Sequence, residues 1–356
     1  MKPEQQRRVG FTCAYTPLPL IHAAGFVPFR ILPLGDAPDQ AGSLLHDNMC
    51  PHVKRVLDRA LIADLPALSG VVFMNSCDAM RRLADAWLAA RPFDRVALVD
   101  LPATADDRSV SYLASELSRL ADLLSDWAGQ TITAESVAES ASRFRDLSGV
   151  LGRLGERAAK ETLPGGRRAL QEALNRSVTM PVDDSLAELC RLETEPHSTR
   201  RHGPLLPLYL FGNVLPDPDA FNLFEGCGAL VVTDDLCTGS RQIVPLEIDA
   251  AQDIFLQLAR GLLSRPACAR TLEVAKPGAL AQHVVTGAKA SGARGVIAHV
   301  VKFCDPYLVR IPAIREALRE AGLPMLVLEG DCTLRSLGQH RTRIEAFVEM
   351  LGGGVV

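Results

Sequence analysis

Short apolar runs alternate with amphipathic stretches along the first part of the chain. The apolar runs predict strands at 9–14, from Val27, at 70–75 and up to Asp100. The stretches between them repeat apolar residues with the period of a helix that packs on one face. The run at 70–75, GVVFMN, is apolar almost throughout, which is typical of a parallel strand buried on both faces. The pattern predicts an N-terminal α/β domain over residues 1–105.

The middle of the chain has a different pattern. Residues 106–200 show the helical period without a convincing strand, so we predict a helical connector there. The stretch 194–204 is polar and interrupted by proline and glycine, and the boundary of the next domain is predicted within it. A second α/β domain is predicted over residues 201–356. Its strands are expected at 205–212, 228–235, 295–301 and 324–330.

The order of these elements predicts the fold class. Strands and helices alternate in both halves, which favours two Rossmann-like (flavodoxin-like) parallel-sheet domains joined by the helical connector, an α/β fold. Two short echoes link the halves. Ala24-Gly25 and Ala321-Gly322 each follow an amphipathic stretch and lead into a predicted strand. Residues 70–72 run into Cys77, and residues 295–297, of similar sequence, run into Cys304. These echoes suggest a duplication, and a ligand site is expected in the cleft between the two domains.

Composition narrows the function classes. A chain of 356 residues exceeds the size at which one core usually stops growing, in agreement with two domains. With 38 basic and 42 acidic residues the net charge is -4, so neither a nucleic-acid surface nor a polybasic membrane patch is indicated. No apolar run approaches the roughly 20 residues of a membrane span, and the N-terminus lacks the apolar core of a signal peptide. We expect a cytoplasmic protein that binds neither nucleic acid nor membrane.

The chain has nine cysteines, which need individual explanations. Disulfides are not expected in a large intracellular protein, because the cytosol keeps thiols reduced. A lone cysteine is most often a small buried side chain. Six of the nine, however, follow a predicted strand or open a predicted helix, where packing alone gives no reason for them. They are Cys13, Cys50, Cys77, Cys237, Cys304 and Cys332.

These six positions favour a metal centre. Ligands of open α/β sheets bind beyond the carboxyl ends of the strands, so side chains placed there converge. Cys50 and Cys304 also open helices, where backbone N–H groups favour the thiolate that binds metal. Scattered thiols without a CxxC pair fit an iron-sulfur cluster better than a zinc ribbon. The other three cysteines are assigned to predicted helices or helix ends and to structural roles: Cys190, Cys227 and Cys268.

Charged residues near these cysteines have competing explanations. Asp78 and Asp305 directly follow two of the candidate ligands, and we favour capping of the next helix over catalysis. Four arginines are candidates for offsetting the charge of a cluster or for binding substrate phosphates, although an exposed helix face explains them equally well. They are Arg81, Arg82, Arg341 and Arg343.

No catalytic residue is assigned from the sequence. His22, His46 and His299 are expected to be ordinary core or surface residues, whereas His52 follows Cys50 closely and is the best candidate for a role at the site. The sequence has no GxGxxG after a strand, no GxxxxGK[ST] loop and no GxSxG turn. Nicotinamide, ATP and hydrolase functions therefore lack support.

Five strings carry a family resemblance: PLPLIHAAG at 17–25, NSCDAMRRL at 75–83, DDLCTGSR at 234–241, FCDPY at 303–307 and GQHRTRIEAF at 338–347. Together they span almost the whole chain, and they resemble the 2-hydroxyacyl-CoA dehydratase / benzoyl-CoA reductase family. That family includes dehydratase subunits, benzoyl-CoA reductase subunits and double-cubane cluster proteins. The chain departs from it at Pro19, where the family string P-x-E-L-I usually has a glutamate.

The resemblance implies a 4Fe-4S cluster on Cys50, Cys77 and Cys304, with the fourth iron position open to substrate or solvent. It also implies an ATP-dependent iron-sulfur activator protein that delivers an electron at very low potential. In dehydratases of this type the electron reduces the thioester carbonyl to a ketyl radical, the radical expels the hydroxyl group, and the electron is recovered. The net reaction is a dehydration of the acyl-CoA.

Three further thiols, Cys13, Cys237 and Cys332, bring the set to the six that two bridged cubanes need, an 8Fe-9S double cubane. Two branches therefore stay open. One is a dehydratase component that acts on an acyl-CoA as a heterodimer with a related subunit, and the other is a homodimeric double-cubane reductase of a small molecule. A non-catalytic iron-sulfur electron carrier or accessory protein, and a zinc-binding structural protein, are the alternatives from other classes.

Overall fold

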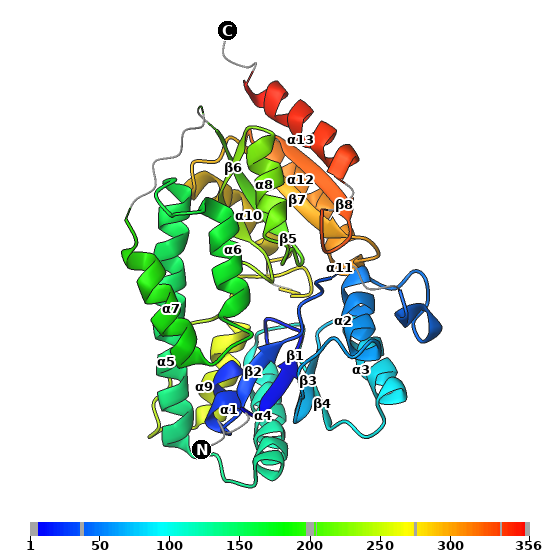
Figure 1. The fold of residues 1–356 in the computed structure, drawn as a ribbon, viewed down its shortest axis with the longest axis vertical. Coiled ribbons are helices and arrows are strands. Elements are labelled where there is room, and N and C mark those ends of the chain that lie inside the picture. Colours follow the sequence, from blue (N-terminus) through cyan, green and yellow to red (C-terminus); the bar gives the residue numbers. More distant parts are fainter. Residues whose placement is uncertain are drawn as a thin grey trace.

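Two parallel sheets of four strands each form the frame of the molecule (Figure 1). The computed structural model describes residues 6–35, 39–196, 203, 205–273, 276–334 and 337–352. All strand pairings within these residues are parallel, which confirms the predicted α/β class with two Rossmann-like units. The predicted domain boundary between residues 200 and 201 lies outside the described residues.

The first sheet and its helices come from the N-terminal part of the chain. They are β1 (Arg8–Phe11), α1 (Leu18–Ala23), β2 (Val27–Arg30), η1 (Ala41–Ser43), α2 (Pro51–Leu61), β3 (Gly70–Asn75), α3 (Asp78–Ala90), β4 (Val96–Asp100) and α4 (Asp107–Ala128). The strand order is β2-β1-β3-β4. Val72 and Met74 pack with α1 and α4, while Val71 and Phe73 pack with α2 and α3. Helices therefore cover both faces of this sheet, and the apolar run of β3 is buried on both.

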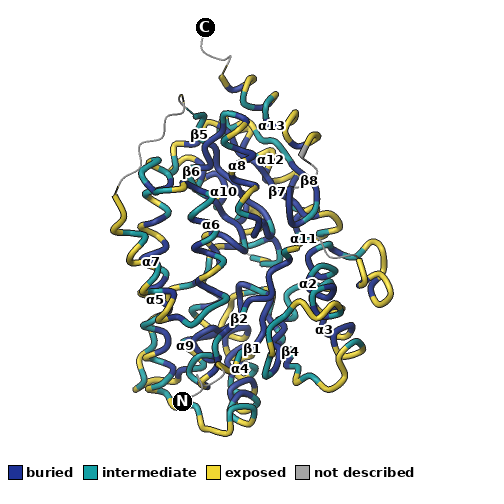
Figure 2. The backbone as a smooth tube through the Cα atoms, viewed as in Figure 1, coloured by how far each residue is buried: buried dark blue, intermediate teal, exposed yellow. Residues whose placement is uncertain are grey.

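The second sheet repeats this order with later elements. They are β5 (Leu206–Gly212), α8 (Asp219–Gly226), β6 (Ala229–Asp235), α9 (Ile254–Leu263), α10 (Ala279–Ala290), β7 (Gly295–Val301), α11 (Asp305–Leu308), α12 (Ile311–Glu320), β8 (Met325–Gly330) and α13 (Leu337–Gly352). The order is β6-β5-β7-β8, so β5 has the place that β1 has in the first sheet. The inner strands of both sheets are buried (Figure 2).

The end of β5 requires a glycine. Gly212 has a φ of 148°, and a Cβ at this position would collide with the backbone carbonyl of His299 in β7. Glycine accepts this backbone conformation and leaves room for the close approach of the two strands. The chain can therefore turn at once toward the neighbouring sheet.

Helices connect the two sheets. After α4 come α5 (Ala134–Ala159), α6 (Gly166–Arg176) and α7 (Val182–Thr194). Asp106 caps α4 by accepting a hydrogen bond from the N–H of Ser109, and Thr133 and Ser136 form a capping box at the start of α5. α5 contacts α1 of the first half and β6 of the second, so it runs along both (Figure 1). None of the described helices combines the length and the apolar composition that crossing a membrane requires.

One helix of the second half packs on the first half. α9 contacts α4 and α5. Its residues Leu258 and Leu262 belong to the same buried cluster as Leu20 of α1 and Val72 of β3. The chain thus returns to the core of the first half before it completes the second sheet.

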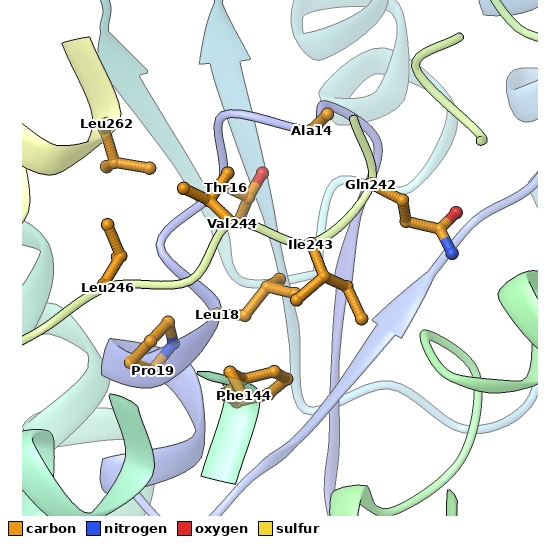
Figure 3. Close-up of a pocket in the computed structure, with 10 residues that line it drawn as sticks. All are labelled: Ala14, Thr16, Leu18, Pro19, Phe144, Gln242, Ile243, Val244, Leu246 and Leu262. Carbon is orange, nitrogen blue, oxygen red and sulfur yellow. The ribbon is translucent and has the colours of Figure 1, made fainter. Parts of the chain in front are cut away.

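A small cavity marks the place where the segment before α9 meets α1 (Figure 3). It measures about 10 Å³, room for about one water molecule. Pro19 is part of its mostly apolar wall, so the departure from the family string falls in a packing contact between the two halves. The wall consists of Ala14, Thr16, Leu18, Pro19, Phe144, Gln242, Ile243, Val244, Leu246 and Leu262.

Candidate metal centre

A cavity of about 120 Å³, here called the thiol cavity, lies where the carboxyl ends of the two sheets meet. Its walls come from the ends of β1, β2 and β3 in the first sheet and from the turns after β5, β6 and β7 in the second. The N-terminus of α2 and the loop after α9 complete them. In parallel sheets this is the edge at which ligands bind. Segments from most of the chain therefore contribute to one site.

Six cysteines line the thiol cavity: Cys13, Cys50, Cys77, Cys237, Cys268 and Cys304. All are free thiols. Five of them belong to the six that the sequence predicts as ligands, whereas the sequence predicts a structural role for the sixth, Cys268. Their convergence follows from the two sheets facing each other with the same edge. That they bind metal stays a prediction.

Three of these thiols occupy the same kind of position. Cys50, Cys77 and Cys304 are the N-cap residues of α2, α3 and α11. The cysteines themselves thus take the cap position that we predicted for the aspartates. Asp78 and Asp305 follow in the first turn, where a negative charge still suits the helix dipole.

The turn before Cys304 has an unusual backbone conformation and is held by hydrogen bonds. Phe303 has a φ of 59°, the left-handed region that a bulky residue rarely adopts. The side chain of Asn213, directly after β5, donates a hydrogen bond from Nδ2 to Sγ of Cys304 at 3.0 Å. Its Oδ1 accepts from the N–H of Val301 at 2.9 Å, and its carbonyl accepts from the N–H of Cys237 at 2.7 Å. Asn213 therefore fixes the turns that carry two of the cavity's thiols.

Burial dominates the acidity of these thiols. It raises the pKa of Cys50 to about 12 and the pKa of Cys77 to about 11, and it also raises the pKa of Cys304. The backbone N–H groups of His52 and Val53 lower the pKa of Cys50, as a helix N-terminus should, but they do not outweigh burial. The helix start thus favours the thiolate of Cys50, as expected, but burial opposes it more strongly. A bound cation would supply the missing stabilisation.

The six thiols lie close enough to affect one another's pKa. Burial raises the pKa of Cys237 to about 12, and the charges of Cys268 and Cys13 add to this rise. After burial, Cys13 acts in the same sense on the pKa of Cys77, and Cys268 on that of Cys304. Cys304 and Cys77 both act on Cys50. Cys304 also acts on Cys77, ahead of Cys13. The six thiols are therefore close neighbours around one cavity.

Cys268 does not lie on a helix or at a helix end, contrary to the sequence-based assignment. It lies in the loop after α9, and its Sγ is 3.7 Å from Oη of Tyr15 and 3.8 Å from Oγ1 of Thr271. Pro266 precedes it closely, and a proline there is the signal that could have placed Cys268 in a loop.

Cys332 is fully buried but lies outside the wall of the thiol cavity. It follows β8, the edge strand, and packs in the same cluster as Cys50. Its backbone N–H donates to Oδ1 of Asp331 at 2.6 Å, and both carboxylate oxygens of Asp331 lie 2.9 Å from Nε of Arg55 in α2. This strand end therefore ties α2 to the second sheet.

Arginines that sequence reasoning did not single out surround the thiols. Arg30, Arg265 and Arg270 line the thiol cavity, and Arg30 is only 1% exposed. Arg30 donates to the carbonyl of Cys237 at 2.7 Å and to Oε1 of Gln242 at 3.1 Å. Within the described part of the chain, none of the three guanidinium groups forms an ion pair with a carboxylate. The cavity therefore carries positive charge that favours anionic contents.

The arginines proposed from the sequence lie elsewhere. Arg81 and Arg82 are exposed on α3, where Arg82 is 3.7 Å from Asp78. Arg341 and Arg343 are exposed on α13, and Arg343 donates to the carbonyl of Val327 at 2.7 Å. For these four residues, the exposed helix face was the better of the two explanations.

His52 lines the thiol cavity, as its position near Cys50 suggested. Burial lowers its pKa to about 3, with Arg30 adding to the effect, so its ring is neutral. His22 and His299 do not line this cavity: His22 Nδ1 is 2.7 Å from Oγ of Ser140, and His299 Nε2 is 3.1 Å from the carbonyl of Asp331. They are the ordinary part-buried and core histidines that the sequence predicts.

The donor set suits a group with several metal atoms. No three His, Cys, Asp or Glu side chains of the described residues converge on one point as the ligands of a single ion would. An iron-sulfur cluster spreads its cysteine ligands over different iron atoms. Thiols and guanidinium groups that line one cavity fit such an anionic group.

A second, larger cavity of about 930 Å³ adjoins the first. It lies between α5, α6, the edge strand β6 and α10, and its volume is that of a small-molecule binding site. Arg241 and Arg265 line both cavities. Asp235, at the end of β6, pairs with Arg241 and is 3.3 Å from Nε2 of His283. Charged side chains thus separate the two spaces.

Comparison with known proteins gives one family. The model of the 2-hydroxyglutaryl-CoA dehydratase D-component family matches residues 13–351. The (R)-phenyllactyl-CoA dehydratase beta subunit of Clostridium sporogenes is 24% identical over 99% of this chain and 93% of its own length. The beta subunit of lactoyl-CoA dehydratase from Anaerotignum propionicum is 23% identical over 96% and 91%. A benzoyl-CoA reductase subunit from Thauera aromatica is 21% identical over 89% and 84%.

Proposed function

The chain belongs to the 2-hydroxyglutaryl-CoA dehydratase D-component family, and from this premise we propose that it is the iron-sulfur redox component of a dehydratase-type enzyme that acts on a 2-hydroxyacyl-CoA. The observation that carries the proposal is the thiol cavity. Cysteines from both sheets line one space at the ligand-binding edge of the fold. The guanidinium groups of Arg30, Arg265 and Arg270 in its wall have no carboxylate partner among the described residues.

Cys50, Cys77 and Cys304 are the proposed ligands of a 4Fe-4S cluster. They line the thiol cavity together, and each starts a helix whose N–H groups face the thiol. When bound, a cluster with one open iron position supplies low-potential electrons and a Lewis-acid site. Asn213 donates to the sulfur of Cys304, and hydrogen bonds of this kind set the potential of a cluster.

The larger cavity is the proposed access route for the organic substrate. Its volume of about 930 Å³ is large enough for an acyl group and part of its carrier, and it shares two wall residues with the thiol cavity. Arg241 and Arg265 stand at the junction. Guanidinium groups there would orient a carbonyl oxygen toward the cluster and stabilise negative charge that develops on it.

Two protein partners complete the proposal. The relatives found by comparison are all named as subunits, which supports a related second subunit for this chain. An ATP-dependent iron-sulfur activator is the proposed electron source, and the cytoplasm, where thiols stay reduced, is the proposed location.

A second candidate function is a reductase of a small molecule that uses two bridged cubanes. One observation favours it: the thiol cavity has six cysteines, twice as many as the dehydratase cluster needs. For this candidate function the chain is expected to form a homodimer. The amount of iron bound per chain separates the two candidates, since one cubane has four irons and two have eight.

The first test compares Cys77→Ser with Cys190→Ser, a cysteine exposed on α7. Both proteins are purified without oxygen, and iron and acid-labile sulfide are measured per folded chain. We expect Cys77→Ser to lose most of the iron of the affected cluster and Cys190→Ser to keep all of it. Equal iron in the two variants would contradict the ligand assignment.

The non-catalytic alternative needs a different measurement. The protein is reduced, and its electron paramagnetic resonance spectrum is recorded with and without a 2-hydroxyacyl-CoA. An enzyme should show a spectrum that changes with the acyl-CoA, because the substrate reaches the open iron position. An unchanged spectrum would favour an electron carrier.

A further inference from the structure

Two hydroxyl groups, here called the hydroxyl corner, lie at the thiol cavity. They belong to Tyr15, which lines the cavity, and to Thr271, whose Oγ1 is 3.5 Å from Oη of Tyr15. We propose that the hydroxyl corner binds the 2-hydroxyl group of the acyl-CoA, so that Tyr15 and Thr271 select a hydroxylated substrate. This inference rests on the proposed function, because it takes a 2-hydroxyacyl-CoA as the substrate.

The hydroxyl group of Tyr15 has hydrogen-bonding capacity left for a ligand. Tyr15 follows β1 and is only 7% exposed. Its contact with Oγ1 of Thr271 exceeds the roughly 2.7–2.8 Å of a full-strength O–H···O hydrogen bond. Its other contact within the described chain is Sγ of Cys268 at 3.7 Å, and sulfur is a weak acceptor. Buried polar groups are normally well hydrogen-bonded, so a ligand in the cavity is the partner that this donor lacks.

The hydroxyl group of Thr271 is available in the same way. Its Oγ1 accepts from the N–H of Cys268 at 3.3 Å, and its backbone N–H donates to the carbonyl of Cys268 at 2.9 Å. The oxygen is therefore used in this turn, while the hydroxyl hydrogen is free to turn toward a ligand. A substrate hydroxyl group can accept from one residue of the corner and donate to the other, which makes it a suitable occupant.

Contacts from both halves of the molecule hold the hydroxyl corner in place. The guanidinium groups of Arg265 and Arg270 lie over the ring of Tyr15, 4.8 and 5.6 Å from its centroid. Such contacts fix the orientation of an aromatic ring. Arg270 also donates to three carbonyls of the first half, those of Ser76, Leu101 and Pro102. The two hydroxyl groups are thus ordered before a ligand arrives, which lowers the entropic cost of binding.

The position of the corner fits the hydroxyl group of the proposed substrate. Arg265, which lies over Tyr15, lines both the thiol cavity and the larger cavity. Burial raises the pKa of Cys304, and the charge of Cys268 contributes in the same sense, so these two thiols are close. The corner therefore borders both the proposed access route and a proposed cluster ligand. The hydroxyl group of a 2-hydroxyacyl-CoA is on the carbon next to the thioester carbonyl, and this carbonyl must reach the cluster.

The test compares two ligands that differ by one hydroxyl group, 2-hydroxybutyryl-CoA and butyryl-CoA. Their affinities for the full chain, reconstituted with iron and sulfide without oxygen, are measured by isothermal titration calorimetry. We expect the wild type to bind the hydroxylated ligand about tenfold more tightly, because butyryl-CoA leaves the hydroxyl corner unpaired. Tyr15→Phe should bring this ratio close to one without changing the affinity for butyryl-CoA.

Tyr112→Phe is the matched control. Tyr112 is exposed on α4, and its hydroxyl group donates to Oδ2 of Asp100 at 3.2 Å. This variant also loses a phenolic hydroxyl group, yet it should keep the wild-type ratio of affinities. If Tyr15→Phe fails to fold, as judged by circular dichroism, Thr271→Val removes the other hydroxyl group and should lower the ratio by about threefold. An unchanged ratio in Thr271→Val then overturns the inference.

The remaining outcomes separate this inference from the proposed function. Equal affinities of the wild type for the two ligands, or a ratio that Tyr15→Phe leaves unchanged, overturn the hydroxyl corner and leave acyl-CoA binding standing. Loss of iron with Cys268→Ser overturns it as well, because metal rather than substrate would then occupy this corner. A wild-type chain that binds neither acyl-CoA overturns the proposed function itself.

Discussion

The two halves of the molecule share a strand order and differ at equivalent strand ends. Strand register pairs Phe11 of β1 with Arg30, and Phe211 of β5 with Asp235. Two residues beyond each phenylalanine stand Cys13 in the first half and Asn213 in the second. The first half thus has a thiol and a cation where the second half has an amide and an anion.

This difference shows how one scaffold serves two roles. The first half sends Arg30 across to the carbonyl of Cys237, whereas Asp235 stays within its own half and pairs with Arg241. The thiol of Cys13 lines the cavity, whereas the amide of Asn213 holds the thiol of Cys304. The sheets determine where such side chains meet, and a few strand-end residues determine what they do there.

The largest difference between the halves is expected from substitutions at the turn after the inner strand. Gly212 of β5 stands where the first half has Thr12. We expect Gly212→Ala to lower the free energy of unfolding by about 4 kcal/mol, because its Cβ would collide with the carbonyl of His299. The matched change Thr12→Ala should cost about 1 kcal/mol, since it removes a buried side chain that lies 3.6 Å from Sδ of Met80. Chemical denaturation measures both, and equal losses would contradict the difference between the turns.

A smaller effect is the loss of stability at low pH. His299 of β7 occupies the position that Phe73 has in β3, so the second half has an ionisable side chain where the first half has an apolar one. Burial lowers the pKa of His299 to about 4, with the charge of His340 adding to the effect. The unfolded chain, with an ordinary histidine pKa of about 6.5, then takes up the proton more readily. The free energy of unfolding should therefore fall by about 2 kcal/mol between pH 7 and pH 5 on account of this residue.

The measurement for His299 is the slope of stability against pH. His299→Gln should flatten it over this range, while His46→Gln, an exposed histidine, should leave it as it is. Parallel curves for wild type and His299→Gln would show that the folded protein accommodates the charged ring.

The smallest expected effect is on the reduction potential of the proposed cluster, through Asn213. Asn213→Leu should keep the iron of the proposed cluster but lower its reduction potential, because the hydrogen bond that it removes favours the more negative, reduced form of the cluster. Loss of the bonds to Cys304 and Val301 should reduce stability by about 1 kcal/mol. Redox titration followed by electron paramagnetic resonance gives the potential.

Asn75→Leu is the control for Asn213, because this asparagine ends β3 and donates to Asp100 rather than to a sulfur. Its cluster should titrate like the wild type. An unchanged potential in Asn213→Leu would show that the contact with Cys304 only positions the turn.

The sequence predicts the frame of the fold because both sheets are buried on two faces. The run at 70–75 and the helix after it coincide with β3 and α3. Five of the six cysteines chosen by their place after a strand or before a helix do line one cavity. Periodicity and the geometry of parallel sheets are local rules, and these features depend on little else.

Other parts of the site depend on contacts between distant segments. In the sequence Arg30 looks like an ordinary strand residue. Its guanidinium contacts the carbonyl of Cys237 only because the two halves pack together. Cys268 lies in a loop whose course is set by α9 packing on the first half. Cys332, after β8, packs in a cluster with residues of α2 rather than on the cavity wall, and strand order is not visible in the hydrophobic pattern. Such features need the tertiary fold.

The packing of α9 on the first half affects how the protein folds during translation. The core of the first sheet includes Leu258 and Leu262, so it stays incomplete until well over half of the chain has been translated. Domains usually fold in the order in which they emerge. Here the earlier half must wait for a segment of the later one, which raises the contact order and slows folding. During that interval the nascent chain exposes the apolar surface of α1 and α4. We expect a chaperone to bind this surface until α9 has been translated.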